Sequence, residues 1–404
     1  MAARKDKKNE EEAKLTKGTK GTEFKKEKKE IDPLKAFQMT SAAVETKFAE
    51  TAYHAWLHDA EKMKQYRFSS GSISVDTALG GEGLPYGRII EVWGPSQSGK
   101  TSWALETAWH LQRRRREEGK GYGVVFMDIE HKFDRRLLYQ WRGGFLPEAT
   151  KFEEPFTGDA AFGMLLHYVE SMGTCMVIVD SVSAIRSSEM LDKDDQKTNF
   201  GAPAKLIGDW LPKISTAATM TGVPIMFVNQ VRAKLDAGPK AMGRAKLRKY
   251  GGMAYDHWVC VSLYLGKSTV INDGLRDLGH MAKMVIYKNH SGPTMFKEFK
   301  LKLDYGRQFD TTYELVDRAT QLSIISGGAG GHYKIGDVAI HGKDNLYAEV
   351  RGNLGLQSYL WDEIMKMQVH QPLPETDLST TSWAIEDEGV EITLDDHEEG
   401  LLEE

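Results

Sequence analysis

The chain has 404 residues, of which 41% are hydrophobic and 10% aromatic, a composition typical of a globular protein with one large or two smaller domains. No apolar run approaches the roughly 20 residues that a membrane span needs, so the sequence excludes an integral membrane protein. The lysine-rich N-terminus is not followed by an apolar segment, so we expect no secretory signal. Only two cysteines occur, Cys175 and Cys260, which excludes a disulfide framework and predicts a reducing, cytoplasmic compartment.

Charge is distributed unevenly along the chain. The formal net charge is -5, but the last nineteen residues, Glu386 to Glu404, contain ten Asp or Glu and no Lys or Arg. Without this acidic tail the chain is net basic. The tail either imitates a polyanion and competes with it for a basic groove, or only increases solubility, and charge alone favours neither.

Apolar spacing predicts one helix near 42–64 and, from Gly71 onward, strands that alternate with helices. The expected strands are 88–93, 123–127, 174–179 and 223–228, and the expected helices are 101–116, 159–172 and 203–220. Buried strands alternating with helices are typical of a parallel sheet covered on both faces. After residue 256, strands follow one another at 258–265, 282–287 and 296–303. They predict an antiparallel extension of the same sheet, or its edge.

The same pattern divides the chain into segments. Their predicted bounds are a disordered charged tail at 1–31, an N-terminal helical segment at 32–68, an α/β core at 69–326, a small C-terminal unit at 327–371 and an acidic tail at 372–404. A glycine cluster, Gly327 to Gly331, begins the small unit, and Pro372 marks its end.

The turn after the strand at 88–93 carries a phosphate-binding motif. It reads Gly94-Pro95-Ser96-Gln97-Ser98-Gly99-Lys100-Thr101, a complete G-x-x-x-x-G-K-[ST] match between a predicted strand and a predicted helix. Backbone N–H groups at a helix N-terminus hold phosphate oxygens, and glycines allow close approach. In this motif Lys100 reaches the β- and γ-phosphates and Thr101 ligates Mg²⁺. The sequence therefore predicts a nucleotide site that uses Mg²⁺.

Carboxylates follow two other predicted strands. Asp180 ends the apolar run that starts at Met176, which suits an acid that holds Mg²⁺ through water. Asp128 and Glu130 follow the strand at 123–127, at the end where ligands of open α/β sheets bind. Glu130 is our candidate general base for an attacking water, with Asp128 as the competitor. Either acid could instead cap a helix or form a salt bridge, and we interpret His131 as structural.

The strand at 223–228 leads through Asn229-Gln230 into a basic segment. The Gln230 amide can hydrogen-bond a γ-phosphate or its water and so report which nucleotide is bound. From Arg232 to Gly252 the sequence has no regular apolar period and only one acid. Its cations are Arg232, Lys234, Lys240, Arg244, Lys246, Arg248 and Lys249. Their charge fits a loop that binds a DNA phosphate backbone, the alternative being a solvated basic loop.

Together these motifs resemble the core of the bacterial RecA recombinase family. The shared stretches, in chain order, are Ser69 to Gly80, Gly83 to Glu91, the phosphate-binding turn, Asp128 to His131, Val179 to Val182, Phe227 to Arg232, Gly251-Gly252 and Lys288-Asn289. The resemblance covers about residues 69–320. It implies a RecA-like P-loop ATPase core with a mostly parallel central sheet, an antiparallel extension, an N-terminal helix that packs on the next protomer and a small C-terminal unit.

The resemblance also implies a function in DNA recombination and repair. Such a protein is a DNA-dependent ATPase, uses ATP and Mg²⁺, and forms helical filaments of its own copies on single-stranded DNA, which it pairs with double-stranded DNA. Single-strand-binding or mediator proteins are expected partners, and a membrane is not. The alternative is a RecA-fold ATPase motor or a recombination mediator without strand exchange.

Residue roles follow from the resemblance. Glu130 falls on the catalytic glutamate, Asp180 on the Walker B acid, and Lys100 and Thr101 on the Walker A pair. Gln230 falls on the glutamine that couples the γ-phosphate to the second DNA-binding loop, at about 231–250. The remaining assignments are Lys288 for ATP across the subunit interface, Asp134 and Tyr305 for adenine, and Phe200, Gly201 and Lys205 for DNA at and after the first loop, about 189–201.

Several positions depart from the family pattern. His290 stands where bacterial members carry a second interface lysine, and Leu137 replaces a tyrosine that stacks on adenine. Asp256-His257 replaces a Lys-Phe pair at a position that faces the neighbouring protomer. These departures predict a diverged member of the family, encoded by a bacterium or a phage.

Overall fold

A computed structural model of the protein describes residues 66–81, 83–171, 173–185, 202–233, 247–292, 298–306 and 308–369, together with Lys35, Met39 and Thr294. Two compact units, Met1–His58 and Asp59–Glu404, divide the chain. Every helix and strand named below belongs to the second unit. The helix predicted at 42–64 and the tails predicted at 1–31 and 372–404 lie outside the described residues.

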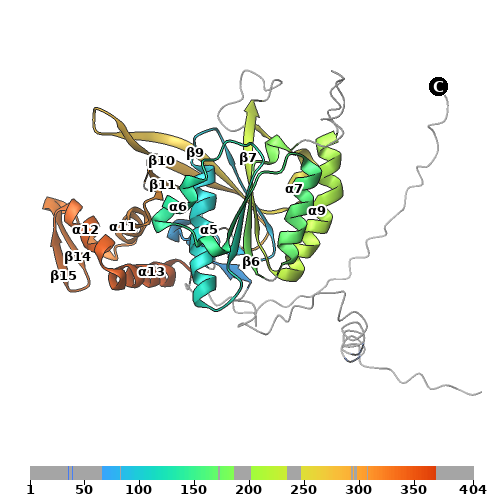
Figure 1. The fold of residues 1–404 in the computed structure, drawn as a ribbon. Helices are drawn as coiled ribbons and strands as arrows, with labels where there is room; N and C mark the ends of the chain where they lie inside the picture. The colour runs from blue at the N-terminus through green and yellow to red at the C-terminus, as the bar shows by residue number, and fades with distance from the viewer. Residues whose placement is uncertain are drawn as a thin grey trace, which may run out of the picture. The chain divides into compact units, whose positions relative to one another are not determined.

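One large sheet forms the centre of this unit, and ten strands of the described residues belong to it (Figure 1). Its main path runs β12-β11-β10-β9-β3-β7-β6-β4-β5. The strands are β3 (Ile89–Gly94), β4 (Gly123–Asp128), β5 (Thr150–Glu153), β6 (Thr174–Asp180), β7 (Ile225–Ala233), β9 (Val259–Asn272), β10 (Asp277–Asn289), β11 (Glu298–Asp304) and β12 (Gln308–Phe309), and β8 (Leu247–Lys249) pairs with β7 off this path.

The sheet is parallel from β9 to β5, and β10, β11 and β12 extend it in antiparallel order. Parallel neighbours need long crossovers, whereas β9 and β10 are joined by a short turn. The predicted fold class, a mostly parallel sheet with an antiparallel extension, is therefore confirmed.

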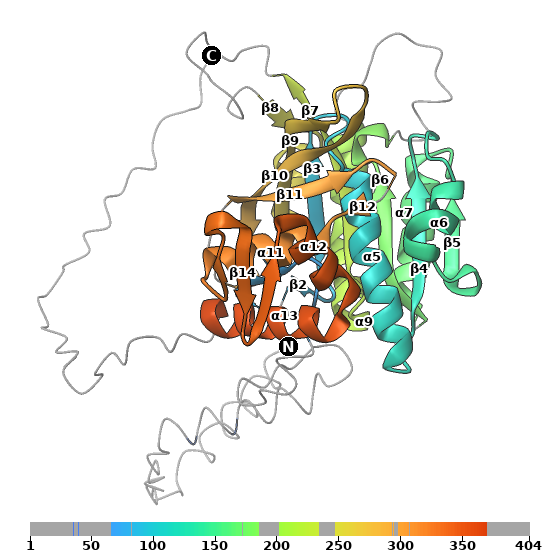
Figure 2. The ribbon, with the colours of Figure 1, turned by 90° about the vertical axis from the view of Figure 1, so that its left-hand side faces the viewer.

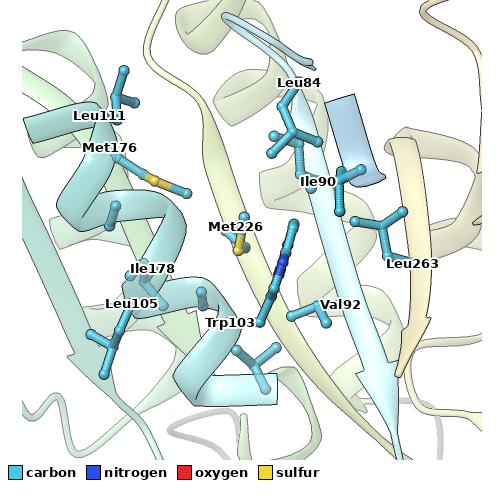
Figure 3. Close-up of a cluster of buried hydrophobic side chains, with 14 of the residues drawn as sticks. Leu84, Ile90, Val92, Trp103, Leu105, Leu111, Met176, Ile178, Met226 and Leu263 are labelled. Atoms are coloured by element: carbon cyan, nitrogen blue, oxygen red, sulfur yellow. The ribbon is translucent and has the colours of Figure 1, made fainter. Parts of the chain in front are cut away.

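Helices cover both faces of the sheet: α5 (Lys100–Glu117) covers one, and α7 (Gly158–Glu170) and α9 (Ala202–Thr221) cover the other (Figure 1). Strand β6 shows why two cores form. Met176 and Ile178 belong to the cluster under α5, while Val177 and Val179 belong to the cluster under α7 and α9. Successive strand residues point to opposite faces, so a continuous apolar strand supplies both cores. Figure 3 shows the first cluster, with Trp103 lying among strand residues.

Shorter elements connect these layers. They are β1 (Arg67–Phe68), α4 (Ile73–Ala78), β2 (Leu84–Pro85), α6 (Arg136–Gln140), η1 (Trp141–Gly143), η2 (Pro147–Ala149), η3 (Val182–Ala184) and α10 (Gly252–Trp258). None of the helices in the described part of the chain is both long enough and apolar enough to cross a bilayer.

A third apolar cluster lies in the C-terminal part, where Figure 2 shows α11, α12, α13 and β14 gathered together. Its elements are α11 (Thr311–Gln321), β13 (Ile325–Gly327), η5 (Ala329–Gly331), β14 (His332–Ile335), β15 (Val338–His341), α12 (Lys343–Gly352) and α13 (Leu354–Val369). The cluster includes Leu315 and Val316 of α11 and Ile73 of α4. The packing of this unit thus begins before residue 327, the predicted boundary, which falls at the end of β13.

A buried carboxyl joins α11 to α4. Glu314 is 3% exposed, and its Oε2 accepts a hydrogen bond of 2.5 Å from Ser72 Oγ, the N-cap of α4. The Ser74 N–H donates to the same oxygen at 3.4 Å. Burial disfavours the charged form and raises the pKa of Glu314 to about 8. Burial therefore favours the protonated form of this carboxyl at neutral pH.

Replacing Glu314 with Gln is expected to stabilise the fold at pH 8. The unfolded glutamate releases its proton near pH 4.5 and the folded one near pH 8, so the free energy of unfolding falls as pH rises between these values. One pKa unit is worth about 1.4 kcal/mol, and the folded and unfolded pKa values differ by several units. The free energy of unfolding of the variant should therefore exceed that of wild type at pH 8 by at least about 1 kcal/mol. Urea unfolding at pH 5 and pH 8 measures this, with the exposed Glu170→Gln as control. A difference independent of pH contradicts the assignment.

Candidate active site

The carboxyl ends of β3, β7, β6 and β4 bring the predicted nucleotide-binding residues together. These four strands are neighbours in the sheet and parallel, so their C-terminal ends meet at one edge. A cavity of about 190 Å³ opens there. Among its lining residues are Ser96, Gln97, Lys100, Thr101, Asp128, Glu130, Asp180 and Gln230.

The phosphate-binding turn joins β3 to α5 and depends on two glycines. A Cβ atom at Gly94 would lie 2.0 Å from the Leu265 carbonyl oxygen, so only glycine fits against the neighbouring strand. Gly99 is the N-cap of α5 and has a φ of 93°, in the left-handed region that favours glycine. It has no side chain to cap the first turn of α5, whose N–H groups and positive dipole end therefore suit an anion.

Lys100 begins α5 and lies over the turn. Its side chain is buried, at 7% exposure, and its Nζ donates a hydrogen bond of 2.6 Å to the Pro95 carbonyl. Burial lowers the pKa of Lys100, and the negative charges of Asp180 and Glu130 offset this only in part. A buried cation beside free helix N–H groups is the arrangement that binds a polyphosphate.

Thr101 and Asp180 form a pair that fits Mg²⁺. The Thr101 hydroxyl donates to Asp180 Oδ2 at 2.5 Å, and burial raises the pKa of Asp180 to about 6. Oxygen atoms of this kind are the ligands that Mg²⁺ prefers. Among the described residues no group of three or more His, Cys, Asp or Glu could hold a metal. Mg²⁺ held here would take its other ligands from phosphates and water, as this ion commonly does in nucleotide sites.

The two competing acids have different surroundings. Asp128 is 2% exposed, and its oxygens accept the backbone N–H groups of Glu130 at 3.1 Å and of Lys132 and Phe133 at 2.8 Å. It therefore holds the turn in place. The Glu130 carboxylate lines the cavity, where its Oε1 accepts hydrogen bonds from Gln230 Nε2 and Ser181 Oγ. This geometry favours Glu130 as the general base, which stays a prediction.

Other predicted residues lie outside this cavity. Lys288 Nζ donates to the Asp256 carbonyl of α10 at 2.7 Å, and its predicted role needs a neighbouring protomer. Asp134 forms an ion pair of 2.6 Å with Arg136. Tyr305 connects to the phosphate-binding turn through His280, whose ring nitrogens lie 3.3 Å from the Tyr305 hydroxyl and 3.5 Å from the Ser98 carbonyl oxygen.

The structure describes only part of the predicted DNA-binding set. Arg232 and Arg248 are cross-strand neighbours in the antiparallel pair of β7 and β8, and Lys205 is exposed on α9. Six of the remaining residues lie outside the described part of the chain: Phe200, Gly201, Lys234, Lys240, Arg244 and Lys246. The seventh, Lys249, ends β8.

Lys249 is held in the protein interior, an arrangement that the DNA-binding prediction does not anticipate. Its side chain is 14% exposed, and its Nζ lies 2.7 Å from Glu91 Oε2 and 2.5 Å from Asp256 Oδ1. Glu91 is fully buried in the middle of β3, where Asn229 and Ser262 also donate to its carboxylate. A buried charge needs a partner, so Lys249 neutralises Glu91.

Replacing Lys249 with Ala is expected to destabilise the protein. The change leaves the Glu91 carboxylate buried without its cation, and breaking a buried ion pair costs roughly 3–5 kcal/mol. Urea unfolding measures the loss, and the exposed Lys205→Ala is the control, which should leave the unfolding midpoint unchanged. If Lys249→Ala instead weakened DNA binding at unchanged stability, its direct contact with DNA would be supported.

Sequence reasoning missed a second group of residues beside Glu130. Glu130 and Gln230 also line a larger cavity of about 450 Å³, together with Ser183 and Phe156. Phe156 is 86% exposed, and its ring stacks on that of His131 with centroids 5.8 Å apart. Ser181 directly follows Asp180, the predicted metal-binding acid, and Ser183 lies two positions further along. Serines after a strand commonly form turns, so these positions gave no specific signal.

Comparisons with known proteins agree with this geometry. The family model described as the RecA N-terminal domain matches residues 35–310. Protein RecA of Cereibacter sphaeroides is 28% identical over 337 residues, which cover 83% of this chain and 90% of that protein. Protein RecA of Desulforapulum autotrophicum is 30% identical over 304 residues, covering 72% and 84%. Protein RecA of a Wolbachia strain is 29% identical over 286 residues, covering 70% and 77%. The chain therefore belongs to the RecA family.

Proposed function

We propose that this protein is an ATP-dependent DNA recombinase that assembles as a helical filament on single-stranded DNA and exchanges strands with homologous double-stranded DNA. One observation carries the proposal. Gln230 lines the nucleotide cavity, donates to Glu130 and lies on β7, the strand that leads into the basic segment 231–250. A change at the nucleotide can thereby reach the segment whose charge suits DNA.

The chemistry is hydrolysis of ATP to ADP and phosphate. Lys100 and the N–H groups of the turn bind the phosphates, and Thr101 and Asp180 hold Mg²⁺, which neutralises developing phosphate charge when bound. Glu130 accepts a proton from the attacking water. Asp134 and Tyr305 are our proposed adenine contacts.

Assembly places this site between protomers. Lys288 is proposed to reach the ATP of the neighbouring copy, so that filament growth and ATP binding depend on each other. We expect the protein to work in the cytoplasm of a bacterial or phage-infected cell, with single-strand-binding or mediator proteins as partners.

Negative-stain electron microscopy tests the assembly. The protein is imaged with single-stranded DNA and a slowly hydrolysed ATP analogue, beside a sample without nucleotide. We expect extended helical filaments only when the nucleotide is present. Closed rings would favour a RecA-fold motor instead. Dispersed monomers would contradict the proposal. The departures from the family pattern at Asp256, His257 and His290 would then be the first candidates for the loss of the protomer interface.

DNA binding itself has a separate signature. Contacts to phosphates release counterions, so affinity for single-stranded DNA should fall steeply as salt rises. A flat salt dependence would contradict binding through the basic segment.

A further inference from the structure

The carboxylate of Glu130 is bound asymmetrically. Its Oε1 accepts hydrogen bonds from both Gln230 Nε2 and Ser181 Oγ. Its Oε2 lies 3.4 Å from Nζ of Lys132, a side chain that is 77% exposed. Among the described residues, one oxygen is therefore held by two close donors, and the other has only a long contact with a solvated cation.

A second serine completes this arrangement. Ser183 belongs to η3, and its Oγ lies 2.5 Å from the Ser181 Oγ. Ser181 is fully buried and carries one hydroxyl proton, which it donates to Glu130 Oε1 because a carboxylate can only accept. The proton between the two serines must then come from Ser183. Ser183 therefore donates a hydrogen bond to Ser181, and Ser181 donates one to Glu130.

We propose that Ser183 is a positioning residue that fixes the Glu130 carboxylate through Ser181. With its proton committed to Glu130, the Ser181 hydroxyl accepts a hydrogen bond from Ser183, and this second bond restricts the rotation of the hydroxyl. The chain holds Oε1 in place and leaves Oε2 as the oxygen that takes the proton of the attacking water. This inference rests on the proposed ATP hydrolysis and concerns the positioning of its base, because Ser183 reaches Glu130 through Ser181.

The test compares ATP turnover of wild type and Ser183→Ala with saturating single-stranded DNA. Small displacements of a catalytic group slow chemistry more than binding, so we expect kcat to fall roughly 10-fold with KM for ATP changed less than about twofold. Ser183→Thr keeps the hydroxyl and should restore kcat to within about threefold of wild type. Ser183→Val has the same shape as the threonine without the hydroxyl and should remain slow. Ser215→Ala, on α9 and outside this network, is the control.

A double-mutant cycle tests the relay, by which we mean the action of Ser183 on Glu130 through Ser181. If Ser183 acts only through Ser181, the double variant Ser181→Ala/Ser183→Ala should be no slower than Ser181→Ala alone. Additive losses overturn the relay, and so does a Ser183→Ala enzyme with wild-type kcat or with a raised KM alone. Should the Ser181 variants fail to fold, the Thr and Val pair at position 183 decides the question.

Failure of this inference is distinguishable from failure of the proposed function. If wild type hydrolyses ATP and Ser183→Val is as fast as Ser183→Thr, the relay is wrong and the ATPase stands. If wild type binds the nucleotide without turnover in the presence or absence of DNA, the proposed function is wrong.

Discussion

Replacing Glu130 with Gln is expected to reduce ATP turnover by about 10²–10⁴-fold while ATP binding persists, because an amide cannot accept the proton that a general base removes. The change is nearly isosteric, and the amide oxygen can still accept hydrogen bonds from Ser181 and Gln230. The variant should therefore collect in its ATP-bound form. Single-turnover hydrolysis and equilibrium binding of ATP measure the two quantities separately.

Asp128→Asn is the matched control for this variant. The Asp128 oxygens accept three backbone N–H groups, and an amide group replaces one of these acceptors with a donor. We expect this variant to lose stability, since a buried N–H without its acceptor costs roughly 1–3 kcal/mol. Unchanged turnover in Glu130→Gln together with lost turnover in a folded Asp128→Asn would transfer the role of base to Asp128.

Replacing Lys100 with Ala is expected to remove most ATPase activity and, with it, ATP-dependent filaments. Lys100 is 7% exposed, and its ammonium lies beside the phosphate-binding turn, so it stabilises phosphate charge in a site screened from water. Loss of one such group typically costs 10²–10³-fold in turnover. Turnover assays and electron microscopy on single-stranded DNA check both effects.

The control for this variant is Lys151→Ala, which removes an exposed lysine on β5. It should turn over ATP at the wild-type rate when the nucleotide is saturating. Normal ATP-dependent filaments formed by Lys100→Ala would contradict the role assigned to Lys100.

The core of the fold could be predicted because its signals are local. Apolar runs of strand length, separated by segments with helical periodicity, predict β3, β4, β6 and β7. Candidate site residues follow at or just after the end of each of these strands. Strand β5, with the sequence TKFE and no fully buried residue, was missed because a half-exposed edge strand has no such run. Strand β9 extends to Asn272 instead of the expected 265, since its outer half is mostly exposed and polar.

What could not be predicted depends on contacts between distant residues. Glu91 and Lys249 are separated by 158 positions, and only the order of strands in the sheet brings them together. A charged residue within the apolar run Ile89–Trp93 was nonetheless a usable signal, because a buried carboxylate requires a partner. The Ser183–Ser181–Glu130 chain gave no comparable signal, since serines after a strand commonly form turns.

The pairing of β7 with β8 limits how far the basic segment can extend. The two strands pair from Val231 with Lys249 to Ala233 with Leu247, so both ends of the stretch 234–246 start from adjacent strands. A chain with adjacent ends can extend outward by no more than half its contour length, roughly 20 Å here at about 3.4 Å per residue. Any DNA backbone that the side chains of this stretch contact must therefore pass within that radius, plus the length of one side chain, of the end of β7, a few residues from Gln230.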